Sequence, residues 1–168
     1  MPYAFTLTTT IKATPRQIYD AWLDSRAHGA MTGSKAQQSA KVGDAVTAWD
    51  GYINGKNVAL IPGRTIVQTW RTTKFTDAHG DSTITVNLAP VAGGTQLTLT
   101  HADVPDGQTS YEQGGWQRSY FEPMQRYFAK AQRKPAAKKA PARKAAKKSG
   151  AKKRPARRPA AKRKSRKR

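Results

Sequence analysis

The sequence predicts an α+β fold: an antiparallel sheet of about six to seven strands wrapped on a long C-terminal helix, followed by a basic tail. Two patterns carry this prediction. Apolar and polar residues alternate in residues 3–12 and in several short runs between 45 and 101, as in half-buried strands. Apolar and aromatic residues then recur at intervals of four between 116 and 128, as on one helix face. Sheet and helix can bury these faces against each other.

The first strand is predicted in residues 3–12, where two parities alternate. Polar residues occupy one parity, namely Thr6, Thr8, Thr10 and Lys12, and the apolar residues Tyr3, Phe5, Leu7 and Ile11 fall on the other. A helix start follows the strand. Thr14 can cap the helix, Pro15 suits its first position, and Gln17 completes a T-x-x-Q capping box. An apolar stripe at helical spacing comes next, made of Ile18, Ala21 and Trp22. We expect a short second helix around residues 27–31.

A run of short strands follows, each bounded by a turn signal. We expect strands at Ala45–Trp49, Tyr52–Ile53, Val58–Ile61, Arg64–Arg71, Thr83–Leu88 and Thr95–His101. The turns are indicated by glycine-containing pairs, namely Asp50-Gly51, Asn54-Gly55, Pro62-Gly63 and Gly93-Gly94. These connections are short enough for neighbouring strands to pair in antiparallel fashion.

The last predicted element is a long helix that begins near Pro105, with Asp106 as a plausible cap, and ends near Gln132. Its apolar face is strongly aromatic and includes Trp116, Tyr120, Met124 and Phe128. Pro123 lies inside this helix and has no N–H to donate to the carbonyl of Ser119. We therefore expect a kink near Ser119.

Three segments also resemble a known family. They are IKATPRQIYDAWLD (11–24), VTAWDGYINGKNVALIPGRTIVQTWR (46–71) and LTLTHADVPDGQTSYEQGGWQRSYFEPMQRYF (97–128). They resemble the START-like, or SRPBCC, helix-grip superfamily, and within it the bacterial group named after the activator of heat-shock-protein-90 ATPase. The resemblance implies a helix-grip fold over nearly all of residues 3–130. It implies a chaperone partner only weakly, because the eukaryotic co-chaperone pairs this domain with another that engages the chaperone.

The resemblance also directs attention to the space between sheet and helix, where this fold can hold an apolar ligand. The candidate pocket residues are Trp49, Gln68, Trp70, His101, Trp116 and Tyr120. Each has two interpretations. His101 and Gln68 are either polar contacts for a ligand or structural groups that bond to their neighbours. The aromatic side chains either line a cavity or fill the core.

The residues that catalysis needs are scarce, so we expect a protein that is not an enzyme and needs no cofactor or metal. There is no cysteine, and Glu112 and Glu122 are the only glutamates. The three histidines stand singly, without a metal-ligand spacing. The segment GAMTGSK (29–35) lacks the glycine spacing and the preceding strand of a phosphate-binding loop.

The chain divides by composition into a domain, 1–132, and a tail, 133–168. The tail holds 19 of the 31 Lys and Arg residues and no acidic residue, so the domain is left with a charge of about +2. It lacks large apolar side chains, which predicts disorder, and its composition resembles the C-terminal domains of linker histones.

We expect this tail to bind the phosphate backbone of DNA, or of RNA, without sequence selectivity, because it carries no aromatic or base-reading element. The candidate contacts are Lys138, Lys139, Arg143, Lys144, Lys147, Lys148, Lys152, Lys153, Arg154, Arg157, Arg158, Lys162, Arg163, Lys164, Arg166, Lys167 and Arg168.

The sequence therefore predicts a cytoplasmic, nucleoid-associated protein whose domain has room for an apolar small molecule. The N-terminus has no secretory pattern and no stretch is long and apolar enough to span a bilayer. No apolar residues accompany the basic charge, which argues against membrane binding. Two alternatives remain: a small-molecule carrier or sensor that the tail only localises, and a co-chaperone-like stress protein.

Overall fold

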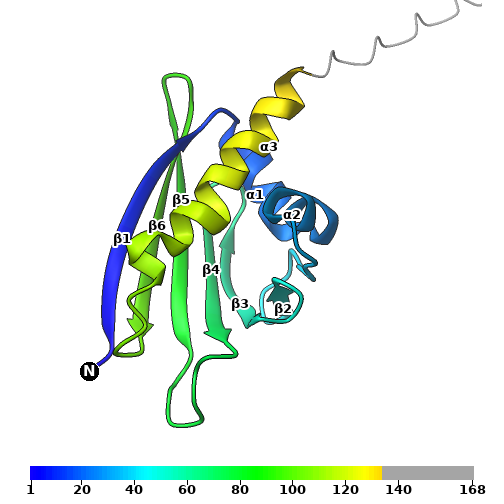
Figure 1. The fold of residues 1–168 in the computed structure, drawn as a ribbon. Coiled ribbons are helices and arrows are strands. Elements are labelled where there is room, and N and C mark those ends of the chain that lie inside the picture. The colour runs from blue at the N-terminus through cyan, green and yellow to red at the C-terminus, as the bar shows by residue number, and fades with distance from the viewer. Residues whose placement is uncertain (134–168) are drawn as a thin grey trace, which may run out of the picture. The chain divides into compact units, whose positions relative to one another are not determined.

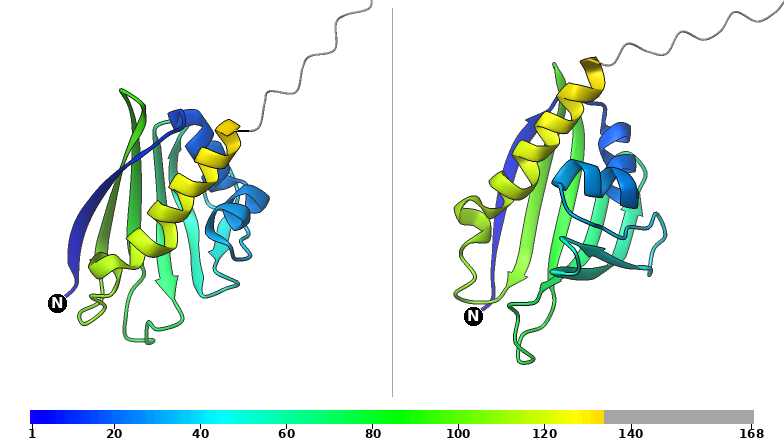
Figure 2. Two further views of the ribbon diagram at one scale, coloured as in Figure 1. Left: turned by 45° about the horizontal axis from the view of Figure 1, so that its top comes forward. Right: turned by 45° about the vertical axis from the view of Figure 1, so that its right-hand side comes forward.

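The computed structural model describes residues 1–133, which form an α+β domain with one six-stranded antiparallel sheet in the order β1-β6-β5-β4-β3-β2. This architecture confirms the predicted fold class. The elements are β1 (Tyr3–Ile11), α1 (Pro15–Leu23), α2 (Ser25–Thr32), β2 (Ala45–Ala48), β3 (Ile53–Ile61), β4 (Thr65–Thr72), β5 (Ser82–Val91), β6 (Gly94–Val104), the π-helical segments η1 (Tyr111–Gly115) and η2 (Gln117–Phe121), and α3 (Glu122–Arg133). In Figures 1 and 2 the C-terminal helix lies across one face of the sheet, and α1 and α2 lie on that same side.

The register of the strands brings the predicted apolar faces together on one side of the sheet. Ile66 on β4 pairs with Val86 on β5, which pairs with Leu99 on β6. In the neighbouring row, Gln68 pairs with Ile84 and Ile84 with His101. All six side chains are buried, so this face of the sheet is the floor of the core. Because side chains alternate across a strand, the paired threonines Thr6 and Thr100, and Thr8 and Thr98, of β1 and β6 lie on the opposite face.

The helices close the core over that floor. Thr14 and Gln17 form the predicted capping box, with backbone N–H to side-chain oxygen distances of 3.2 Å and 2.9 Å. This cap directs α1 so that Ile18 and Trp22 are buried against the sheet. The C-terminal helix contributes Phe121 and Met124, which are also fully buried. Burying side chains of this size from water is the main driving force for this packing.

The prediction of a turn at Asn54-Gly55 is wrong, because both residues lie inside one continuous strand, β3. Asn54 pairs with Arg71 of β4, and Gly55 pairs with Val46 of β2. Glycine is needed here for close approach and not for a turn. A Cβ at position 55 would stand 1.9 Å from the carbonyl oxygen of Thr69, so β3 can reach β4 at this point only without a side chain.

The last helix begins later than predicted. Residues 105–110 form turns, and helical structure starts at Tyr111 in η1. Gln113 and Gly114, the latter with φ of 110°, are non-helical and interrupt the backbone inside η1. The irregularity expected near Ser119 takes the form of a π-helical segment, η2, which ends at Phe121, shortly before Pro123. The predicted tail, with its proposed disorder and its nucleic-acid contacts, lies outside the described residues except for Arg133, where α3 ends.

Candidate functional site

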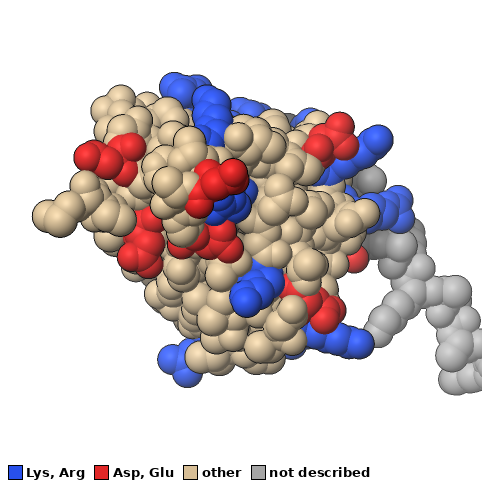
Figure 3. All heavy atoms as spheres, turned by 90° about the horizontal axis from the view of Figure 1, so that it is seen from below, with Lys and Arg blue, Asp and Glu red and all other residues tan. Residues whose placement is uncertain are grey.

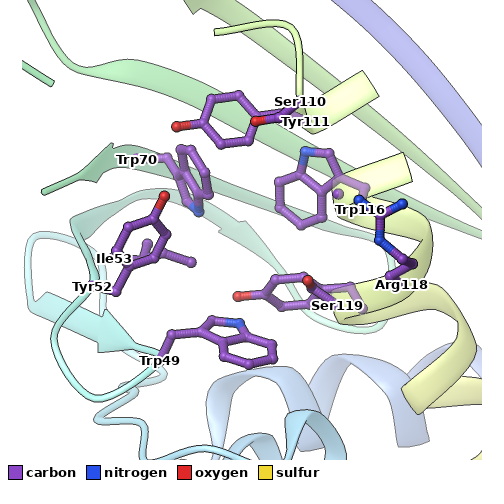
Figure 4. A pocket seen from close by; sticks show the side chains of 11 residues that line it. Trp49, Tyr52, Ile53, Trp70, Ser110, Tyr111, Trp116, Arg118 and Ser119 are labelled. Carbon is purple, nitrogen blue, oxygen red and sulfur yellow. The ribbon is translucent and has the colours of Figure 1, made fainter. Parts of the chain in front are cut away.

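A pocket of about 240 Å³ opens between the turn that joins β2 to β3, the strand β4 and the π-helical segments (Figure 4). Most of its walls are aromatic. The lining residues are Trp49, Tyr52, Ile53, Trp70, Ser110, Tyr111, Gly115, Trp116, Arg118, Ser119 and Tyr120. Concave, mostly aromatic sites with a few polar groups are typical of small-molecule pockets.

One wall depends on an unusual turn after β2. Trp49 and Asp50 have φ of 54° and 56°, and Gly51 follows with φ of 86°. A bulky residue such as tryptophan rarely adopts this left-handed conformation, and such conformations concentrate at functional sites. The turn places Trp49 beside Tyr120, with ring centroids 6.4 Å apart, and brings Tyr52 to the same cavity.

The opposite wall depends on the π-helical backbone. The backbone N–H of Trp116 donates to the carbonyl of Tyr111, five residues earlier, across the non-helical residues Gln113 and Gly114. Both side chains face the cavity, together with Tyr120. Trp116 lies 4.7 Å from Tyr120 and 5.7 Å from Trp70 between ring centroids. The rings thus form a continuous aromatic surface.

Burial raises the pKa of two tyrosine hydroxyls of this surface above its ordinary value. It raises the pKa of Tyr111 to about 12, and it raises that of Tyr120 further, although a hydrogen bond from Trp49 opposes the shift. The Tyr111 hydroxyl lies 3.0 Å from Oγ1 of Thr72 and donates to Oε1 of Gln108 at 3.2 Å. At neutral pH these groups can donate and accept hydrogen bonds but cannot act as anions.

His101 lies behind the aromatic wall and does not line the pocket. The indole N–H of Trp116 donates to its Nδ1 at 3.3 Å, so the ring proton sits on Nε2 and is directed to Ser82 Oγ at 2.9 Å. Ser82 in turn donates to the carbonyl oxygen of Trp70 at 2.6 Å. Burial lowers the pKa of His101 to about 3. The imidazole is therefore neutral. It bonds directly to Trp116, and through Ser82 it is connected to the backbone of Trp70.

Gln68 also lies away from the aromatic pocket, in a buried amide cluster. Its Oε1 accepts the indole N–H of Trp22 at 3.1 Å, and its Nε2 donates to Asn57 Oδ1 at 2.8 Å and to Gln38 Oε1 at 3.3 Å. The cluster borders a space of only about 10 Å³, as does His28, which is room for about one water. Every polar atom of the Gln68 amide thus has a protein partner.

The structure brings together four of the six predicted pocket residues, namely Trp49, Trp70, Trp116 and Tyr120, and places Gln68 and His101 elsewhere in the core. Tyr52, Tyr111 and Arg118 also line the pocket and were not predicted. Tyr52 follows a recognised turn signal, but Tyr111 falls outside a four-residue stripe because it lies five residues before Trp116, across a non-helical break at Gln113 and Gly114. Within residues 1–133, no group of three or more His, Asp or Glu side chains could hold a metal ion, and no helix is long and apolar enough to cross a membrane.

The fold and its pocket define a helix-grip domain with an aromatic site between the sheet and the C-terminal helical region. Residues 12–129 match the family described as activator of Hsp90 ATPase homolog 1-like protein, and the chain belongs to that family. The part of the chain that matches includes all the residues that line the pocket.

Curated relatives and solved structures agree with this assignment. The chain is 28% identical over 123 residues to the human activator of 90 kDa heat shock protein ATPase homolog 1, covering 73% of this chain and 36% of that protein. It is 29% identical over 119 residues to the mouse homolog 2, covering 71% and 36%. The chain thus spans about a third of these relatives. The fold matches an HSP90 activator from Plasmodium falciparum with a TM-score of 0.68 and 23% identity, covering 76% and 96% of the two chains.

Proposed function

We propose that this protein is a non-catalytic binding protein whose domain takes an apolar small molecule in the aromatic pocket. The observation that carries the proposal is the cavity of about 240 Å³ with six Trp and Tyr side chains in its wall. Its lining residues include no carboxylate, imidazole or thiol, and those are the groups that most often perform acid–base or nucleophilic chemistry. Stacking and burial of apolar surface are the interactions that this wall offers.

Native mass spectrometry of the protein purified from its own host tests the proposal. We expect a bound molecule that is released on denaturation. Ser119→Phe fills the pocket from its rim and should abolish the adduct. Gln117→Phe is the matched control, since Gln117 is exposed and does not line the pocket. A protein that neither carries nor gains any apolar ligand would contradict the proposal.

We further propose that residues 133–168 hold the protein on nucleic acid in the cytoplasm, at the nucleoid, through non-specific contacts with phosphates. The supporting observation is the 19 basic residues of this segment against none that are acidic. The domain supplies no comparable charge. On the face seen in Figure 3, basic and acidic side chains are interspersed. Gel shifts with unrelated duplexes should show binding that is lost at high salt and on deletion of 133–168. Equal binding after the deletion would falsify this role.

A co-chaperone-like role is a separate candidate, and the observation that favours it is membership of a family whose curated relatives are named as activators of the heat-shock ATPase. The match covers only 36% of the human relative, so the test asks whether this chain makes a chaperone contact. Pull-down of the purified host chaperone by the full-length protein tests it. Failure to retain the chaperone at micromolar concentration would remove this candidate.

A further inference from the structure

The mouth of the aromatic pocket carries one charged side chain, Arg118. No acidic residue lines the cavity, and Arg118 takes part in none of the ion pairs among residues 1–133. Its guanidinium lies against the backbone at Gly114, where a Cβ would stand 3.0 Å from Nη1. The missing side chain at 114 therefore leaves the space that the guanidinium occupies at the rim.

The inner part of the cavity offers hydrogen-bond donors. Figure 4 shows the indole nitrogen of Trp70 directed into the pocket, and no hydrogen bond joins this N–H to another described residue. The indole of Trp116 points the other way, toward His101, and is already paired. An indole N–H can only donate. The Trp70 N–H is therefore available as a donor, and it offers no acceptor to a cationic ligand.

The positive charge of Arg118 decides between two classes of ligand that aromatic walls attract. Ring faces bind organic cations as well as flat apolar molecules. A cation in this cavity would meet the positive charge of Arg118 without any carboxylate in the wall to balance it. An anion would meet an arginine, which pairs carboxylates through two parallel hydrogen bonds. The lining therefore favours a flat apolar anion.

We propose that the pocket binds a small aromatic carboxylic acid, with its ring between Trp49, Trp70 and Tyr120 and its carboxylate paired with Arg118 at the mouth. This inference rests on the proposed ligand-binding function and names its chemical class. The volume of about 240 Å³ sets the size. A cavity of about 150 Å³ holds a benzene molecule, so this pocket has room for one or two fused rings.

Calorimetric titration of the full-length protein with three probes that share a naphthalene ring tests the class: 2-naphthoate, 2-naphthamide and a naphthylmethyl trimethylammonium salt. Titration at about 0.3 M salt screens exposed charges, those of the basic segment included. We expect 2-naphthoate to bind about tenfold more tightly than the amide, and the ammonium salt to bind most weakly. Arg118→Gln should bring the acid and the amide to equal affinity.

Arg126→Gln is the matched control. Arg126 lies on the same helical region, is exposed and lies 3.8 Å from Glu122, and it does not line the pocket. It should leave the preference for the acid unchanged, while the charge of the basic segment is identical in both variants. Equal binding of acid and amide by the unaltered protein, or a preference for the ammonium salt, overturns the acid class and leaves the apolar pocket standing. Failure of all three probes to bind counts against both.

Discussion

The indole N–H of Trp116 donates to Nδ1 of His101 over 3.3 Å, and this contact determines which nitrogen of the imidazole carries the proton. Because tryptophan can only donate, Nδ1 has to be the acceptor, and Nε2 donates to Ser82. A second proton would put two donors face to face in a site without a compensating carboxylate. The contact thus connects the position of a pocket wall to the protonation state of a residue outside the pocket.

This relationship predicts a loss of stability in mild acid. The pKa of His101 falls from 6.5 to about 3 on folding because the ring is buried, and burial lowers the pKa of His28 as well. Below pH 6.5 these histidines are therefore protonated in the unfolded chain but stay neutral in the folded domain. The free energy of unfolding consequently falls as the pH is lowered, down to the folded pKa. His101 alone should lower it by about 2 kcal/mol between pH 7.5 and pH 5. Urea denaturation at the two pH values measures the change.

His101→Gln isolates this contribution. The amide can still accept from Trp116 but does not titrate, so the variant should lose less stability than the parent between pH 7.5 and pH 5. It is expected to be about 1–2 kcal/mol less stable at pH 7.5, because glutamine cannot match both hydrogen bonds of the ring. An unchanged pH dependence would show that His101 is not the group responsible.

Gln68 is expected to be a structural residue. Replacing it with leucine leaves the buried N–H of Trp22 without an acceptor and removes the donor to Asn57. Gln68→Leu should lower the free energy of unfolding by about 2–3 kcal/mol. Gln96→Leu, at an exposed position of β6, should change it by less than about 0.5 kcal/mol. If Gln68→Leu instead weakens 2-naphthoate binding without loss of stability, Gln68 contacts the ligand.

Gly55 is expected to tolerate no side chain. Its Cβ would stand 1.9 Å from the Thr69 carbonyl oxygen, so Gly55→Ala has to push β3 away from β4. We expect a loss of about 3 kcal/mol or more, the upper end for overpacking. Gly80→Ala is the control, because nothing lies within 4 Å of a Cβ there. Thermal unfolding of the two variants separates close approach from a general cost of replacing glycine.

The salt dependence of DNA binding tests how many charges of the basic segment act. If all 19 basic residues of 133–168 met phosphates, the logarithm of the affinity would fall with the logarithm of salt with a slope near ~17. About half that value is realistic. Fluorescence anisotropy with a labelled duplex gives the slope, and two duplexes of unrelated sequence should give the same value. A slope near zero, or a clear sequence preference, would contradict backbone binding.

The alternation of apolar and polar residues was enough to predict most of the sheet, because a one-residue shift in register would expose the whole apolar face. The capping box at Thr14 was also predictable, since its hydrogen bonds are local. Gly55 was misread as a turn residue because its reason lies in a neighbouring strand, 14 positions away in the chain at Thr69. A pattern within one segment carries no information about such an approach.

In the candidate pocket, too, some residues were predictable from local periodicity and others depend on distant parts of the chain. Trp70, Trp116 and Tyr120 were predictable as inward-facing residues from strand and helix periodicity. Gln68 and His101 share that inward direction, but the structure gives them protein partners away from the pocket. Arg118 and Tyr111 were not predictable, because the break in the helical backbone at Gln113 and Gly114 brings them to the cavity.

By itself, the sequence determined the fold class, the faces of the strands, the start of the first helix and the charge of the segment from 133 to 168. These follow from local periodicity, capping and composition, which act over a few neighbouring residues. Only the tertiary structure decided which aromatic rings enclose a cavity, which polar groups are already paired, and where Arg118 stands. These depend on distances between segments far apart in the chain, and packing the sheet against its helices sets those distances.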